Sequence, residues 1–75
     1  MLMQNVVKNR EIRMMSMLRD LSHGKNLSEV ARRYRANDLI LASSISRFAG
    51  KYGIDQRMAL RDKASLVLRA MKRNG

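Results

Sequence analysis

Residues 26–48 have the sequence NLSEVARRYRANDLILASSISRF, which predicts two helices separated by a short break. Asn26 is followed three residues later by Glu29, a spacing at which the two side chains can satisfy each other's free backbone amides at a helix start. Apolar residues then recur at helical spacing until residues 36–38, where Asn37 or Asp38 can cap a second helix. The segment therefore predicts a short helix that ends at about residue 35 and a longer one that follows it.

The apolar spacing also predicts which side chains of these two helices face the core. Those expected to face inward are Leu27, Val30, Ala31 and Tyr34 in the short helix and Leu41, Ile45, Phe48, Ala49 and Tyr52 in the long one. Arg32 and Arg35 are predicted to face outward. Arg33 follows Glu29 by four residues and is expected to pair with it, so we do not count Arg33 among the free cations.

The same periodicity continues on both sides of this segment and predicts one further helix before it and one after it. The first covers about residues 5–22 and ends at Gly24, which supplies the left-handed position after a helix. The last covers about residues 56–73, with Asp55 as its N-cap. The expected core residues are Val6, Val7, Met14, Met17, Leu18 and Leu21 in the first and Leu60, Ala64, Val67, Leu68 and Met71 in the last. Residues 1–75 are thus predicted to form a single all-α domain of four helices.

The segment 27–35, together with Ser43-Ser44-Ile45-Ser46-Arg47-Phe48, resembles the helix-turn-helix of small bacterial and phage regulators and of transposase DNA-binding domains. Ala31 matches the small inner residue that lets the family's two helices approach closely, and Ile45 and Phe48 match the apolar anchors of its second helix. The family's turn usually has Gly, a small apolar residue and a polar cap, where this chain has Arg35-Ala36-Asn37-Asp38. The resemblance implies a compact four-helix domain with a central helix-turn-helix-like unit.

The charge of the chain points to the same class of partner. It has 16 Lys and Arg residues, eleven of them Arg, against 6 Asp and Glu, for a formal net charge of +10. A small domain with so one-sided a field repels itself, and it tolerates this when it has a polyanionic partner. Because Arg suits bidentate contacts with phosphates and guanine, we expect sequence-preferring binding of double-stranded DNA, by a transcriptional regulator or an accessory factor of a phage, plasmid or other mobile element.

The residues expected to contact DNA fall into two groups. Phosphate contacts, which position the protein without reading sequence, are expected from Lys25, Arg32, Arg35 and Lys51. Arg47 is the best candidate for a guanine contact, with Ser43 and Asn37 as lesser candidates for base contacts. The resemblance adds Ser44 and Ser46 to the reading face, beside Ser43 and Arg47.

An alternative function is that of a small helical module that binds RNA or docks on an acidic host protein. The three aromatic residues, Tyr34, Phe48 and Tyr52, form no stacking platform for single strands, but structured RNA bound through arginines stays open. Ile12 and Met15 lie on the opposite side of the first helix from its main stripe, and Met58 and Leu66 are placed in the same way near the last helix. Ile12 and Met15 could build a homodimer interface or the surface for such a partner.

Several other classes of function have little support in the sequence. There are no cysteines and one histidine, His23, so we expect neither a metal site nor a cofactor. The acidic residues are scattered and each glycine is isolated, so we expect no enzyme. No apolar run approaches the roughly 20 residues that span a bilayer, the N-terminus lacks a secretory pattern, and a chain without Trp is a poor fit to a membrane surface. We therefore expect a cytoplasmic protein.

Overall fold

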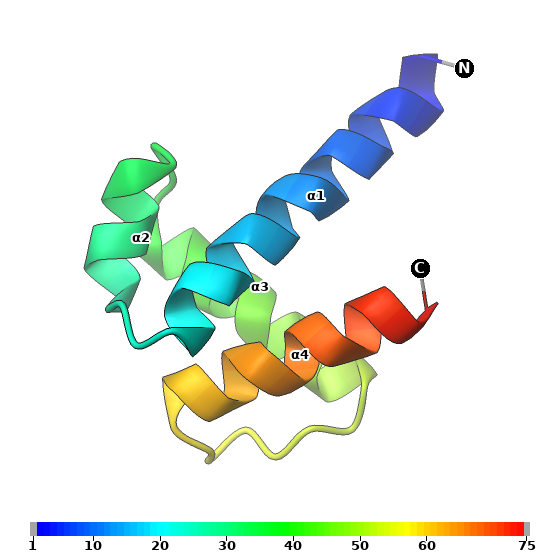
Figure 1. Ribbon diagram of the computed structural model, residues 1–75. Coiled ribbons are helices and arrows are strands. Elements are labelled where there is room, and N and C mark those ends of the chain that lie inside the picture. The colour runs from blue at the N-terminus through cyan, green and yellow to red at the C-terminus, as the bar shows by residue number, and fades with distance from the viewer. Residues whose placement is uncertain (1, 75) are drawn as a thin grey trace.

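The computed structural model describes residues 2–74, and within them the side chains of residues 9–73. It contains α1 (Leu2–Ser22), α2 (Leu27–Arg33), α3 (Asp38–Lys51) and α4 (Leu60–Asn74), in that order along the chain (Figure 1). This part of the chain has no strand, so the predicted all-α fold is confirmed.

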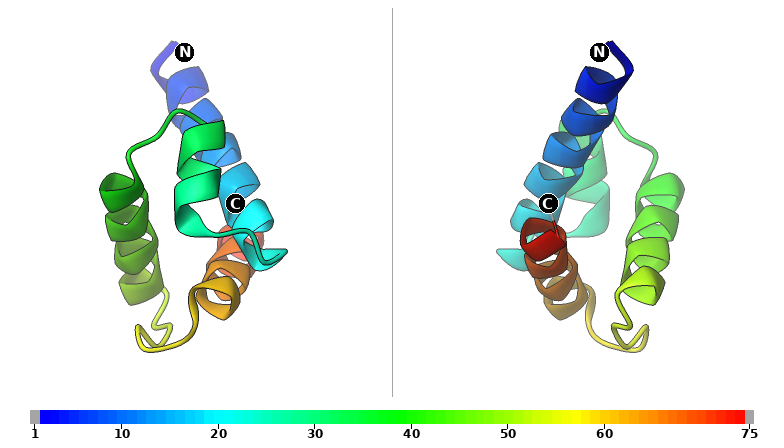
Figure 2. Two further views of the ribbon diagram at one scale, coloured as in Figure 1. Left: turned by 90° about the vertical axis from the view of Figure 1, so that its left-hand side faces the viewer. Right: turned by 90° about the vertical axis from the view of Figure 1, so that its right-hand side faces the viewer.

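The four helices surround one core. α1 packs chiefly against α4 and also against α2, while α3 packs against both α2 and α4. Figure 2 shows that α3 runs along one side of the domain. The N-terminal part of α1 extends beyond the other helices (Figure 1).

The N-caps of α2 and α3 are predicted residues, but of the reciprocal pair expected between Asn26 and Glu29 only the bond to the Asn26 side chain forms among the described residues. The Asn26 side chain accepts a hydrogen bond from the backbone N–H of Glu29 at 2.7 Å. The Asn37 Oδ1 atom accepts from the N–H groups of Leu39, at 2.9 Å, and Ile40, at 3.2 Å. Of the two alternatives at the start of α3, Asn37 is therefore the N-cap and Asp38 is the first helical residue.

α1 and α3 end in the same way, at a glycine in the left-handed conformation. Gly24 has φ 95°, its N–H donates to the Leu21 carbonyl at 3.0 Å, and the Lys25 N–H donates to the Asp20 carbonyl at 3.3 Å. Gly53 has φ 68° and occupies the equivalent position after α3. This pair of bonds is the Schellman motif, which satisfies the last free carbonyls of a helix. The predicted end of the first helix at Gly24 is confirmed.

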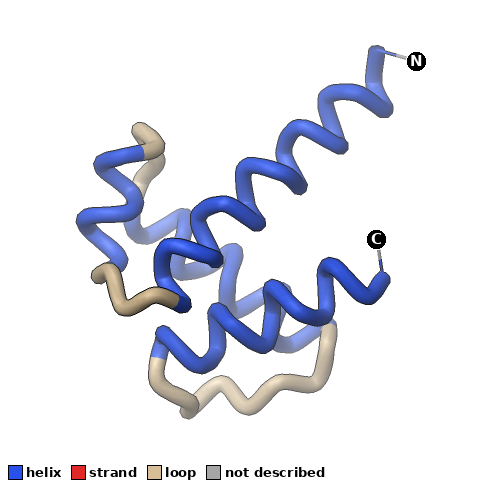
Figure 3. The backbone as a smooth tube through the Cα atoms, viewed as in Figure 1, coloured by secondary structure: helices blue, strands red, loops and turns tan. Residues whose placement is uncertain are grey.

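The predicted start of the last helix is wrong by several residues, because α4 begins at Leu60 and Asp55 does not cap it. The Asp55 Oδ1 atom accepts from the Arg57 N–H two residues on, at 2.9 Å, which closes a local turn that competes with helix capping. Gln56 fastens this turn to α3, since its Nε2 donates to the Ser46 carbonyl at 2.7 Å. The connection between α3 and α4 is the long loop at the bottom of Figure 3.

Every helix contributes apolar side chains to the core. The buried residues are Met14, Met17, Leu18 and Leu21 of α1, Val30 and Ala31 of α2, Leu41, Ile45 and Ala49 of α3, and Ala64, Val67 and Met71 of α4. All twelve were predicted to face inward. Val6 and Val7, predicted to do the same, lie outside the residues whose side chains are described. Met15 departs from the prediction, because it packs against the core. The apolar face of α1 is broader than predicted since α4 packs along its flank.

Polar contacts join α1 to the end of α2. The Asp20 Oδ2 atom accepts a hydrogen bond from the Tyr34 hydroxyl at 3.1 Å and lies 3.5 Å from the Arg33 Nη1 atom. The Arg13 guanidinium donates to the Tyr34 carbonyl. Partial burial, with the hydrogen bond to Asp20, raises the pKa of Tyr34 above its usual value. Arg33 therefore pairs with Asp20 and not with Glu29 as predicted, because the crossing of α1 and α2 offers it a half-buried carboxylate.

Candidate nucleic-acid interface

The turn between α2 and α3 has a conformation that an arginine rarely adopts. Arg35 has φ 54° and is the one non-glycine residue with positive φ in the described chain. Its N–H donates to the Arg32 carbonyl at 3.2 Å, and the Ala36 N–H donates to the Ala31 carbonyl at 2.7 Å, so α2 also ends in a Schellman motif. The turn thus consists of Arg35 in the left-handed conformation, the half-buried Ala36, and Asn37 as the N-cap of α3.

Because Arg35 holds a left-handed conformation, Arg35→Gly is expected to stabilise the fold. A residue with a Cβ atom costs about 1–2 kcal/mol in this conformation, and glycine removes that cost. Glycine also has more freedom in the unfolded chain, which takes back about 0.4–1 kcal/mol of the gain in folding stability. Arg35→Ala removes the same charge but keeps the Cβ atom, so it is the matched control. Urea unfolding should place Arg35→Gly about 0.5–1 kcal/mol above Arg35→Ala in stability. An order reversed between these two variants would contradict the positive φ.

The outward face of α3 is polar and cationic. At 3.6 residues per turn, Ser43 and Arg47 lie at the centre of the face opposite the buried stripe of Leu41, Ile45 and Ala49. Ser43, Ser46, Arg47 and Lys51 are all exposed. The Lys51 Nζ atom lies 5.6 Å from the centre of the Tyr52 ring, which keeps its charge near the C-terminus of the helix. The structure thus brings four of the predicted contact residues onto one helix face.

Two further residues predicted to contact bases are placed less favourably. Ser44 is half-buried at the border between the core stripe and the outward face. The Asn37 side-chain oxygen already accepts two backbone hydrogen bonds as the N-cap of α3. A bidentate contact with adenine needs both the side-chain oxygen and the amide N–H groups. Because the oxygen is already used, Asn37 has only its N–H groups free for a base.

The cations predicted to meet phosphates are exposed and carry no ion pair. In the described side chains, the ion pairs are Arg33 with Asp20 and Arg57 with Asp55. Lys25, Arg32, Arg35, Arg47 and Lys51 are outside both pairs and are exposed to solvent. The exposed cations of α4, which were not among the predicted contacts, are Arg61, Arg69, Lys72 and Arg73. Arg10, Arg13 and Arg19 of α1 are exposed as well, so positive charge extends over all four helices.

Leu39 and Ile40, two apolar side chains on the first turn of α3, were not identified from the sequence. They are 77% and 66% exposed, against 49% for Ile12 on α1, the third exposed large apolar residue among the described side chains. Their exposure could have been predicted from the sequence, because at helical spacing neither residue lies on the same face as the core positions Leu41, Ile45 and Ala49.

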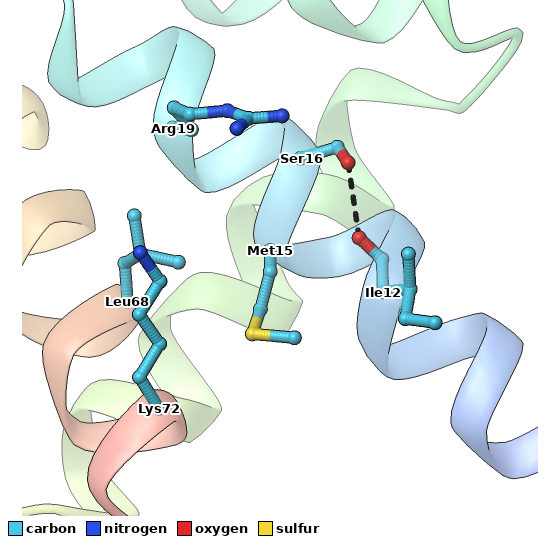
Figure 4. Close-up of a pocket in the computed structure, with 6 residues that line it drawn as sticks. All are labelled: Ile12, Met15, Ser16, Arg19, Leu68 and Lys72. Atoms are coloured by element: carbon cyan, nitrogen blue, oxygen red, sulfur yellow. Dashed lines mark hydrogen bonds between the residues drawn. The ribbon is translucent and has the colours of Figure 1, made fainter. Parts of the chain in front are cut away.

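Ile12 and Met15, the predicted dimer residues, line one open pocket of about 210 Å³ between α1 and α4. The other residues that line it are Ser16, Arg19, Leu68 and Lys72 (Figure 4). The Ser16 hydroxyl is turned back to the Ile12 carbonyl, to which it donates at 3.1 Å. Arg19 and Lys72 would approach their counterparts if two copies met at this pocket, and this repulsion opposes dimerisation here. The dimer stays a prediction.

No helix among the described residues has the length and apolar character that a bilayer crossing requires. Within the same part of the chain, no three His, Cys, Asp or Glu residues gather to hold a metal ion. No protein-family model, curated protein or solved structure matches this chain.

Proposed function

We propose that this chain binds double-stranded DNA with sequence preference, with α3 in the major groove and α2 crossing the backbone beside it. One observation carries the proposal: the outward face of α3 exposes Ser43, Ser46, Arg47 and Lys51, free of ion pairs, while the opposite face is held in the core. A helix held in this way can enter the major groove as a rigid element, and its side chains can reach base edges.

The turn before α3 supports the helix-turn-helix interpretation. Arg35 has the backbone conformation for which the family's glycine is suited, Ala36 is the small half-buried residue, and Asn37 is the polar cap. Ala31, at the position of the family's small inner residue, is buried and lets α2 and α3 pack together. The departure from the family's turn is therefore one of side-chain chemistry and not of backbone conformation.

In this proposal some of the exposed side chains contact phosphates and others contact bases. The side chains that would contact phosphates, and so set the position of the protein without reading sequence, are Lys25, Arg32, Arg35 and Lys51. Arg47, at the centre of the face of α3, would donate to guanine, with Ser43 beside it. A binding protein of this kind, with no catalytic step, suits a transcriptional regulator or an accessory factor of a mobile element.

The salt dependence of duplex binding tests the proposal. If these four cations reach phosphates, log K should fall against log salt with a slope of about −3 to −4 for each bound copy, and about twice that if two copies bind together. The measurement is fluorescence anisotropy of a labelled duplex over a range of salt concentrations, with structured RNA as competitor. Sequencing of the fraction retained from a random duplex pool then gives the preferred site.

Three outcomes would contradict DNA binding. A slope shallower than about −2, or no binding at low salt, would leave the pocket between α1 and α4 as the favoured site. That pocket combines the apolar Ile12, Met15 and Leu68 with the cationic Arg19 and Lys72, a chemistry that fits an acidic amphipathic partner. Competition by structured RNA at concentrations where duplex DNA does not compete would assign the exposed arginines to RNA.

A further inference from the structure

Two neighbouring apolar side chains are exposed at the start of α3. Leu39 and Ile40 are 77% and 66% exposed and lie within the first turn after the N-cap Asn37. Single exposed apolar residues are ordinary on protein surfaces, but here two consecutive positions of one helix turn carry them, and we call these two side chains the apolar patch. The apolar residues that follow them in this helix, Leu41 and Ala42, are buried and half-buried.

The position of this patch relates it to the polar face of α3. Successive helix residues are about 100° apart, so Leu39 and Ile40 lie on either side of the line that runs through Ser43 and Arg47. They therefore continue the proposed reading face toward the N-terminus of the helix. In helix-turn-helix complexes the N-terminal residues of the second helix contact base edges.

The chemistry of the whole face restricts what can cover the patch. Arg47 and Lys51 call for a polyanion, while Leu39 and Ile40 call for an apolar group within the same partner. The major groove of duplex DNA offers both, because thymine presents its C5-methyl group there between two phosphate backbones.

We propose that Leu39 and Ile40 select thymine by packing against its C5-methyl group in the major groove. The inference rests on the proposed DNA binding and adds two specificity-determining residues to the same interface. The helix rise of 1.5 Å per residue places the patch about 10–12 Å from Arg47 along the axis. At about 3.4 Å per base pair, the selected thymine should lie about three to four base pairs from the guanine that Arg47 contacts.

The test uses the preferred duplex obtained by selection from the random pool. Each thymine is replaced in turn by deoxyuridine, which keeps the base pair and removes only the methyl group. The native chain should lose affinity about fourfold for each methyl group that it buries, at one or two positions. The double variant Leu39→Ala, Ile40→Ala should bind the thymine and deoxyuridine duplexes equally. Ile12→Ala, which truncates an exposed apolar residue of α1, is the matched control and should keep the discrimination.

Three outcomes would overturn the inference. Native affinity could be unchanged by deoxyuridine at every position, the selected site could lack thymine at the stated distance, or the discrimination could survive in the double variant. The last outcome would place Leu39 and Ile40 outside the DNA interface, on a surface for a protein partner. The deoxyuridine measurement on the native chain needs no variant, so it tests the inference even if the double variant folds poorly. Absence of any duplex binding by the native chain would instead overturn the proposed function.

Discussion

Ile45→Ala is expected to leave much of the protein unfolded at 25 °C. Ile45 is fully buried at the middle of α3, a helix that packs against both α2 and α4. Truncating a buried isoleucine to alanine costs about 2–5 kcal/mol, because the transfer free energy is lost and a cavity remains. A single small core supplies only about 3–5 kcal/mol of net stability, so the loss is comparable to the whole.

The matched control for this prediction lies on the same helix. Leu39→Ala removes a similar volume of apolar side chain from a position that is 77% exposed, and it should change the free energy of unfolding by less than about 0.5 kcal/mol. Circular dichroism during urea unfolding measures both variants. Cooperative unfolding of Ile45→Ala with a destabilisation below about 1 kcal/mol would mean that α3 is not packed as described.

Arg47→Ala is expected to weaken binding to the preferred duplex by about 1–3 kcal/mol, which is up to roughly a hundredfold, and to abolish the preference at one base pair. The reason is that a bidentate contact with guanine discriminates by this amount. Arg32→Ala should weaken binding to all sequences alike and make the salt slope shallower by about 0.9 for each phosphate that the protein no longer neutralises. Anisotropy titrations on the preferred duplex and on a scrambled one separate the two effects.

Two controls accompany the comparison of the arginine variants. Arg61→Ala removes an exposed cation from α4, outside the proposed interface, and should have the smallest effect of the three. Thermal unfolding of each variant must show an intact fold, since a folding defect would imitate a binding defect. Equal reductions in affinity for the preferred and scrambled duplexes with Arg47→Ala would mean that α3 does not read bases at this position.

The caps and the apolar stripes of this protein could be predicted from the sequence because both are local signals. Asn26 and Asn37 each accept hydrogen bonds from backbone N–H groups two or three residues ahead. Gly24 adopts the left-handed conformation that commonly ends a helix. The twelve buried residues followed from helical spacing alone. The exposure of Ser43, Ser46, Arg47 and Lys51 followed from the same spacing, since they lie opposite that stripe.

The tertiary structure decided what depends on contacts between distant segments. Arg33 pairs with Asp20 of α1 because the helices cross there, and Met15 joins the core because α4 covers that flank of α1. α4 starts late because the turn at Asp55 is fastened to α3 through Gln56. Arg35 is held left-handed because α2 must end and reverse within a few residues for α3 to reach the core, and no propensity of arginine indicates that. A local sequence pattern specifies hydrogen bonds between residues a few positions apart. The ion-pair partner of Arg33, the burial of Met15 and the left-handed conformation of Arg35 are determined only when the helices pack together.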